Sequence, residues 1–241
     1  MSIPRLLAPA CALLLAASSA LVGACSPGGG LGPASQRNLF TELLGKSDAE
    51  VQAKIDSAWQ QQFYGDDATQ RLYYPVGDDQ AYIADIGNAD VRSEGMSYGL
   101  MIAVQLDKRA EFDRLWRWVK AHMYHADGPR RGYFAWQCHF DGTHIDPGSA
   151  SDGEEWFAMA LLFAAHRWSA TPGSIDYAAE AQAILDAMRN DDRGGEITAI
   201  FHPIEKQAVF APTKHASRFT DPSYHLPAFY ELWARWDRTE A

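Results

Sequence analysis

The chain has 241 residues, of which 47% are hydrophobic, 12% aromatic and 22% charged. These proportions suit one globular domain with a sizeable core, and they exclude a disordered or collagen-like chain. The formal net charge is −10 and the basic residues are scattered, which argues against nucleic acid as a partner.

Residues 1–25 have the pattern of an export signal. Arg5 supplies a positive charge, an apolar stretch covers residues 6–22, and small residues lead to Cys25. This order resembles a bacterial lipobox, in which the cysteine becomes the lipidated first residue of the mature protein. Ordinary secretory cleavage near Ala24 is the alternative. We therefore expect an exported protein, either anchored to the membrane through Cys25, in the periplasm or at the cell surface, or secreted.

The signal is followed by a change in composition. Residues 26–36 are rich in Gly, Pro and Ser, which is typical of a flexible linker. Residues 37–241 are then expected to form the folded domain. Within this domain Cys138 is the one remaining cysteine, so no disulfide is expected inside it and a buried apolar role is the preferred interpretation.

The domain is predicted to be all-α. Ser47, followed by acidic residues, is expected to cap the first helix over 48–63. Five further helices are predicted from apolar residues at helical spacing: 94–106, 109–124, a helix after Asp152, 176–190, and a helix with Asp221 as N-cap and Pro222 at its first position. Short extended segments are expected near 71–76, 131–137 and 197–210.

Two kinds of helix alternate in this pattern. Some are strongly apolar and follow a polar turn that carries a carboxylate, whereas others are amphipathic. Inner and outer helices in alternation are what an α/α barrel requires. A helical bundle is the competing arrangement, but its short loops would not suit the long connections predicted here.

Three acidic residues are predicted at helix N-termini: Glu94, Asp152 and Asp221. Taken singly, each is more simply explained as a helix cap, since Asp is a preferred N-cap residue. Taken with Trp136 and Tyr224, they form a set of acids and aromatic rings near helix starts. Glycoside hydrolysis needs a protonated carboxyl, a second carboxylate and surfaces that hold the sugar. The set therefore suggests a glycosidase site with an oligosaccharide as the ligand.

The turn around Glu94 is the most informative part of the sequence. It joins a polar segment to an apolar helix, and Tyr98 lies one turn further on. A carboxyl with a partly apolar wall has a raised pKa, as a general acid working near neutral pH requires. Arg92 is expected to pair with a nearby carboxylate and to orient this turn. We place Arg92 and Tyr98 with the substrate-binding residues.

A metal site is not expected. His139 and His144 flank Asp141, but their spacing fits no pair of ligands on one helix, so polar loop residues are the preferred interpretation. No cofactor is predicted.

Four segments resemble glycoside hydrolase family 8, and most closely its reducing-end xylose-releasing exo-oligoxylanases: DVRSEGMSYGLM, GYFAWQ, SASDGEEWFAMALLFA and TDPSYHLPAFYELWA. The resemblance implies an (α/α)6 barrel that cleaves β-1,4 linkages with inversion. It implies that Glu94 is the general acid and that Asp152 binds and distorts the sugar. Trp136 would stack on a sugar and Tyr224 would be a further cleft residue.

The sequence also departs from the family pattern. An (α/α)6 barrel has twelve helices, whereas about six are predicted here. The general base of similar enzymes lies in a YDAxR-type segment that this sequence does not contain. We therefore expect residues 37–241 to be the N-terminal part of a family 8 catalytic domain, forming an incomplete barrel. Asp221 is a weaker candidate for the base.

The expected function is hydrolysis of β-1,4-linked xylo-oligosaccharides in xylan degradation. A β-1,4-endoglucanase of the same family and an inactive, truncated sugar-binding lipoprotein are the alternatives. The sequence leaves open the glycan, exo or endo action and the oligomeric state.

Overall fold

The computed structural model describes residues 38–171 and 173–237. The predicted signal, linker and lipid anchor on Cys25 lie outside the described residues. Among the helices that are described, none is long and apolar enough to cross a membrane.

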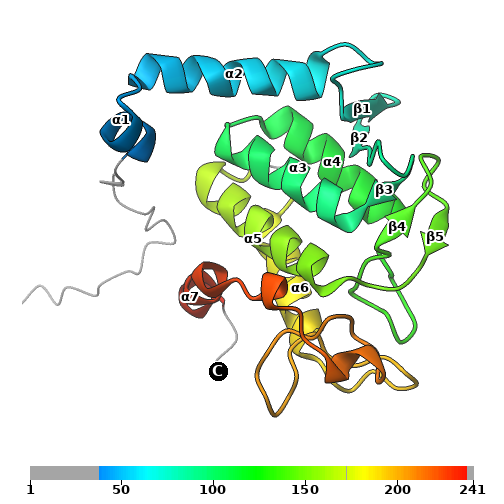
Figure 1. The fold of residues 1–241 in the computed structure, drawn as a ribbon. Coiled ribbons are helices and arrows are strands. Elements are labelled where there is room, and N and C mark those ends of the chain that lie inside the picture. The colour runs from blue at the N-terminus through cyan, green and yellow to red at the C-terminus, as the bar shows by residue number, and fades with distance from the viewer. Residues whose placement is uncertain (1–37, 172, 238–241) are drawn as a thin grey trace, which may run out of the picture. The chain divides into compact units, whose positions relative to one another are not determined.

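Helices dominate the described part of the chain, with a few short strands between them (Figure 1). The helices are α1 (Leu39–Leu44), α2 (Asp48–Tyr64), α3 (Ser93–Gln105), α4 (Arg109–His122), α5 (Ser151–Arg167), α6 (Tyr177–Arg189) and α7 (Pro227–Trp236), with 3-10 turns η1 (Ala216–Arg218) and η2 (Pro222–Tyr224). The strands are β1 (Tyr73–Val76), β2 (Gln80–Ile83), β3 (Val91–Arg92), β4 (Gln137–Cys138) and β5 (His144–Asp146). The prediction of a mostly helical domain is confirmed.

The strands form two small antiparallel sheets. β1 and β2 make a hairpin, and β3, β4 and β5 make a three-stranded sheet in that order. The second sheet matters for the site because β3 runs directly into α3. Extended structure was predicted near two of these strands but not near β2, β3 or β5.

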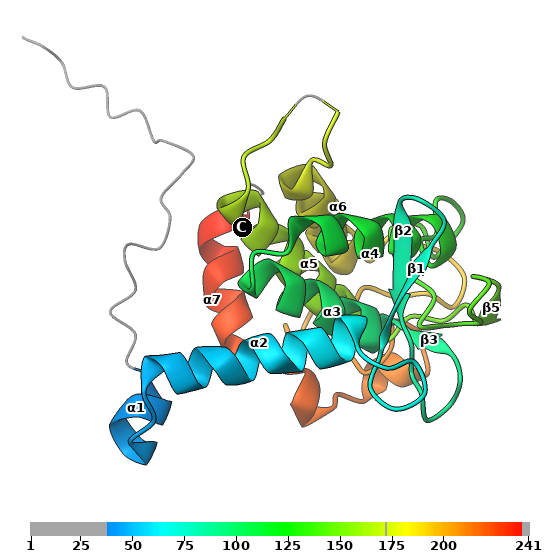
Figure 2. The same cartoon turned by 90° about the horizontal axis from the view of Figure 1, so that it is seen from above.

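The core is built around α5. This helix packs between α3 and α6, while α4 packs against α3 and β2 (Figure 2). Twelve of the 17 residues of α5 are buried. A helix that is apolar nearly all round is expected to be covered on most sides, and the sequence pattern predicted this correctly.

The start of α5 approaches the start of α3 very closely. A Cβ atom added to Gly153 would lie 2.6 Å from Ser93 Oγ and 2.8 Å from Ser93 Cβ. Only glycine fits at such a distance without movement of its neighbour. This contact brings the first turns of the two helices, and the acids they carry, side by side.

The predicted caps were right where the signal was local. Ser47 accepts a hydrogen bond from the Glu50 backbone, and the Glu50 carboxylate accepts one from the Ser47 backbone, which completes a capping box at α2. The interpretation of Asp152 as an N-cap was wrong. The cap residue of α5 is Ala150, without a side-chain hydrogen bond, and Asp152 lies inside the first turn.

The predicted helix after Asp221 consists of two pieces. Asp221 caps only the 3-10 turn η2, and α7 begins separately at Pro227. A proline disfavours helical geometry in the residue before it, and Leu226 has an extended φ of −116°. The short helix α1 was not predicted. All of its residues are exposed, so it lacks the buried apolar stripe on which helix prediction depends.

Candidate active site

Glu94 is held at the junction of β3 and α3. The preceding Ser93 donates its backbone N–H to the Trp136 carbonyl oxygen at 3.0 Å, and its hydroxyl lies 3.4 Å from Glu94 Oε2. Burial raises the pKa of Glu94, while the hydrogen bond from Ser93 and the charge of Arg92 act in the opposite direction. The Glu94 carboxyl therefore stays protonated to a higher pH than a solvated glutamate.

Asp152, on α5, lies near the Glu94 carboxyl. It is buried, with 8% of its surface exposed. Its pKa is raised to about 6, first by burial and then by the negative charge of Glu94. A hydrogen bond from the Gly153 backbone N–H, at 3.0 Å, and the interaction with the Tyr224 side chain limit this rise. Glu94 and Asp152 are thus close enough for their ionisation to be linked.

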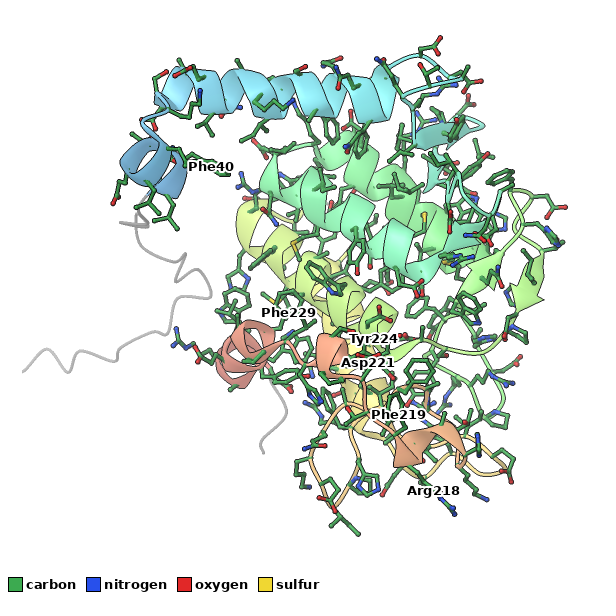
Figure 3. All side chains as sticks on the ribbon, viewed as in Figure 1. Phe40, Arg218, Phe219, Asp221, Tyr224 and Phe229 are labelled. Atoms are coloured by element: carbon green, nitrogen blue, oxygen red, sulfur yellow. The ribbon has the colours of Figure 1, made fainter. Side chains whose placement is uncertain are left out.

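Two tyrosines complete the group. The pKa values of Tyr98 and Tyr224 are raised by burial and then by the charges of Asp152 and Glu94. We call these four residues, Glu94, Tyr98, Asp152 and Tyr224, the acid cluster. Figure 3 shows Tyr224 on the turn that precedes α7. The cluster therefore draws on α3, α5 and η2, which are far apart in the sequence.

Arg92 and Trp136 lie beside the cluster. Arg92 Nε is 3.0 Å from an Asp85 oxygen and 3.1 Å from an Asp90 oxygen, as the predicted carboxylate pairing requires. The Arg92 guanidinium also lies over the Trp136 ring, 5.4 Å from its centroid. The Trp136 side chain in turn interacts with Asp146 and lowers the pKa of that carboxyl. Residues of the three-stranded sheet and of the loops beside it therefore hold both side chains in place.

A pocket of about 520 Å³ opens on one side of Glu94. It brings together three of the predicted residues, Arg92, Glu94 and Tyr98, with apolar side chains from α2 and β2 such as Phe63 and Ile83. Asp152, Trp136 and Tyr224 do not line this pocket. The acid cluster thus forms only part of its wall.

Asp221, the candidate general base, is engaged in hydrogen bonds within its own turn. One carboxylate oxygen accepts hydrogen bonds from the Ser223 backbone at 2.9 Å and from the Ser223 hydroxyl at 2.8 Å. These bonds lower the pKa of Asp221. Its charge nevertheless contributes to the raised pKa of Tyr224. The geometry is that of a turn cap next to the cluster, and its candidacy as general base stays a prediction.

Two buried acids were not singled out from the sequence. Glu154 and Glu155 are both fully buried on α5, and burial raises the pKa of each to about 8. Glu154 accepts a hydrogen bond from the Phe134 backbone at 3.0 Å, and the Tyr230 hydroxyl lies 2.9 Å from Glu155. The available signal was their place in an otherwise apolar helix.

Neither a reactive cysteine nor a metal site is found among the described residues. Cys138 is buried, and burial raises its pKa to about 12, which disfavours the thiolate that a nucleophile needs. Within residues 38–171 and 173–237, no group of three or more His, Cys, Asp or Glu side chains is placed to hold a metal ion.

The arrangement offers two neighbouring carboxyls whose pKa values are raised by burial, together with aromatic rings. This is the equipment of acid-assisted cleavage of a glycosidic bond. Residues 77–240 match the family model of glycosyl hydrolases family 8. The chain belongs to glycoside hydrolase family 8. The family has an (α/α)6 barrel, and the seven α-helices in the described part of the chain make up an incomplete one.

The relatives differ in how much of this chain they match. A reducing-end xylose-releasing exo-oligoxylanase of Paenibacillus barcinonensis is 50% identical over 206 residues, which cover 84% of this chain and 53% of the relative. A solved structure of that enzyme complexed with xylose has a TM-score of 0.78 and 49% identity, covering 83% of this chain and 52% of the other. Endoglucanase A of Acetivibrio thermocellus is 32% identical over 152 residues, 62% of this chain and 29% of the relative. The chain thus spans about half the length of the first two.

Proposed function

We propose that the protein is an inverting glycoside hydrolase that acts on β-1,4-linked xylo-oligosaccharides. The observation that carries the proposal is the half-buried carboxyl of Glu94, which has a raised pKa and lies beside Asp152. Supporting it, the exo-oligoxylanase of Paenibacillus barcinonensis is 50% identical over 84% of this chain.

Each carboxyl of the pair has a distinct task in this proposal. Glu94 donates a proton to the leaving glycosidic oxygen, for which its pKa must lie well above that of a solvated glutamate. Asp152 binds the sugar next to the scissile bond, because its carboxylate can accept a hydrogen bond from a sugar hydroxyl in place of water. This bond favours the distorted form of the sugar ring. The hydrogen bond from Gly153 fixes the orientation of Asp152 during this step.

The aromatic and cationic residues hold the substrate. Trp136 offers a ring that Arg92 and Asp146 keep in place, so a sugar can stack on it with little loss of side-chain freedom. Tyr98 is 45% exposed and packs edge-on against Trp156 at 5.1 Å between ring centroids. We assign Trp136, Arg92, Tyr98 and Tyr224 to substrate binding.

Replacing the proposed acid tests this function. Glu94→Gln keeps the shape of the side chain but has no acidic proton to transfer, so turnover of xylotetraose should fall by roughly 10²- to 10⁴-fold while binding measured by calorimetry persists. Glu180→Gln is the control, since that carboxylate pairs with Lys120 away from the cluster. Equal turnover in the Glu94 variant and the control would refute the assignment.

Sugar binding without turnover is a second candidate. The observation that favours it is the engagement of Asp221, the one base candidate named from this sequence, as the cap of η2. Under this alternative xylotetraose binds but is not cleaved, and Glu94→Gln changes neither result. The two functions are therefore separated by the same pair of measurements.

The mode of cleavage also needs a direct test. Release of xylose from the reducing end is proposed because of the similarity to the exo-oligoxylanase. The more distant similarity to an endoglucanase makes internal cleavage of β-1,4-glucan the alternative. Chromatography of products from cello-oligosaccharides and from xylotetraose labelled at its reducing end distinguishes them, since reducing-end action first releases labelled xylose and unlabelled xylotriose.

We also propose that the protein is exported and anchored through a lipid on Cys25. The support is the sequence pattern of residues 1–25, with a positive charge, an apolar stretch and small residues before the cysteine. Labelling with radioactive palmitate in a bacterial host should mark the wild type but not Cys25→Ala. Equal labelling of both would exclude the anchor.

A further inference from the structure

Glu155 is a buried carboxyl that the proposed reaction does not use. Its Oε1 lies 2.9 Å from the Tyr230 hydroxyl, and no residue in the described part of the chain supplies a hydrogen-bond partner to its Oε2. An ionised carboxylate with an unpartnered oxygen is costly in such surroundings. Burial accordingly raises the pKa of Glu155 to about 8, so the group is largely protonated at neutral pH.

The Tyr230 hydroxyl stands between two oxygen atoms but has one proton to donate. Besides Glu155 Oε1, the backbone carbonyl oxygen of Tyr224 lies 3.3 Å from it. When Glu155 is ionised, Tyr230 donates to the carboxylate and the Tyr224 carbonyl loses this donor. When Glu155 carries a proton on Oε1, it donates to the Tyr230 oxygen, and Tyr230 is then free to donate to Tyr224.

Tyr224 is thereby tied to α5 at two points. Its side chain lowers the pKa of Asp152, and its carbonyl is reached through Tyr230 from Glu155. Asp152 and Glu155 are three residues apart on one helix and therefore share a face. The side chain of Tyr224 therefore interacts with the acid cluster, and its backbone carbonyl is linked to Glu155, a carboxyl outside the cluster.

We propose that protonated Glu155 is a positioning residue that acts through Tyr230 to hold the Tyr224 turn against the acid cluster. The titratable groups that act on Glu155 are Asp152 on its own helix and Tyr230 on α7. The link to sugar binding rests on the proposed function, whereas the chain of hydrogen bonds is a property of the fold. When Glu155 ionises, the Tyr224 carbonyl loses Tyr230 as its donor.

The hydrogen-bond chain can be tested without any sugar. In protein labelled with ¹³C at tyrosine carbonyls, the Tyr224 signal is assigned through Tyr224→Phe and followed from about pH 6 to 9. We expect it to shift around pH 8 in the wild type. Glu155→Gln should abolish the shift, since its amide donates to Tyr230 at every pH. A wild-type signal that does not move, or an equal shift in the variant, would overturn the proposal.

Tyr230→Phe is a second variant with its own expected result. It removes the intermediate hydroxyl, so the Tyr224 signal should be independent of pH and stay near its high-pH position. A full titration in this variant would contradict the proposed path. This measurement decides the question even where Glu155→Gln does not fold.

Sugar binding then tests the consequence for the site. Calorimetry with xylotetraose should give an affinity roughly three- to tenfold lower at high than at neutral pH, the effect of one hydrogen bond, in excess of any change seen for Glu155→Gln. Glu154→Gln is the matched control, since Glu154 has the same raised pKa of about 8 but bonds to the Phe134 backbone. It should retain the wild-type pH dependence. The same loss of pH dependence in both variants would refute the role of Glu155.

The two proposals fail in different ways. If neither the wild type nor any variant binds xylotetraose, the proposed function is wrong. The carbonyl titration then still decides whether Glu155 holds the turn. If xylotetraose binds but the Tyr224 carbonyl does not titrate, the function stands and the positioning role is wrong.

Discussion

The start of α5 and the turn before α7 each carry an aspartate at the beginning of a helical segment. The two aspartates differ in burial, and their pKa values are shifted in opposite directions. Asp152 is buried against α3 and its pKa is raised to about 6. Asp221 accepts two hydrogen bonds from Ser223 and its pKa is lowered. The contrast teaches that an acid near a helix start acquires its chemistry from the packing around it. The close contact at Gly153 provides that packing for Asp152 and is absent at Asp221.

The largest expected difference between the two aspartates is in catalysis. Asp152→Asn should lower turnover of xylotetraose by on the order of 10²-fold or more, because the substituted side chain no longer presents a carboxylate to the sugar. Asp221→Asn keeps a good capping residue and should lower turnover little, unless Asp221 is the base. Steady-state kinetics on both variants checks this. A greater loss in Asp221→Asn would reverse the ranking and favour Asp221 as the base.

The buried acids of α5 should make stability fall as pH rises. Glu154 and Glu155 have folded pKa values of about 8, well above the ordinary value for a glutamate. A carboxyl with a raised folded pKa contributes fully below its unfolded pKa and loses that contribution as pH rises through the folded value. We expect the free energy of unfolding to drop by on the order of a few kcal/mol between about pH 5 and 8.

Denaturant unfolding at a series of pH values measures this drop. Glu154→Gln should make the dependence shallower, since one of the two titrating groups is removed while the acceptor for the Phe134 backbone is kept. Stability that increases over the same range would show that these carboxyls are not neutral in the folded protein.

The sequence predicted those parts of the fold whose signals are local. The capping box at Ser47 and the apolar face of α4 depend on residues within one or two turns, and both were placed correctly. The start of α7 was misplaced because the restriction imposed by Pro227 competes with the strong cap at Asp221. The segments before residue 38 lie outside the described residues, so their predictions remain untested.

The sequence named Glu94, Asp152 and Tyr224 from their residue types, and the pKa values of Asp152 and Tyr224 are affected by these neighbours in the structure. Their roles in a site stay predictions. The sequence pattern predicted that α5 is buried on most sides, but the individual burial of Glu154 and Glu155 was missed. The contacts of α5 with α3, α6 and α7 decide which of its acids are covered, and these contacts join residues far apart in the sequence.

A smaller effect is expected from opening the contact between α3 and α5. In Gly153→Ala the new Cβ would meet Ser93 at 2.6 to 2.8 Å, so the helices must shift at a cost of about 1–3 kcal/mol. Gly95→Ala is the matched control, since its Cβ would lie 3.7 Å from Ile83 and alanine favours a helix. Urea unfolding should show a loss for the first variant and none for the second. Equal stability would mean that the two helices tolerate separation.

The smallest effect should come from the cap of η2. Asp221→Ala removes the acceptor for the Ser223 backbone and hydroxyl, whereas Asp221→Asn retains one. We expect the alanine variant to lower the melting temperature less than Gly153→Ala does, and the asparagine variant to leave it nearly unchanged. The pKa of Asp221 is lowered in the fold, so its contribution is present above the unfolded pKa and is lost as pH falls through the folded value. Any difference between wild type and alanine variant should therefore vanish in acid. A difference that grows in acid would show that the carboxylate does more than cap the turn.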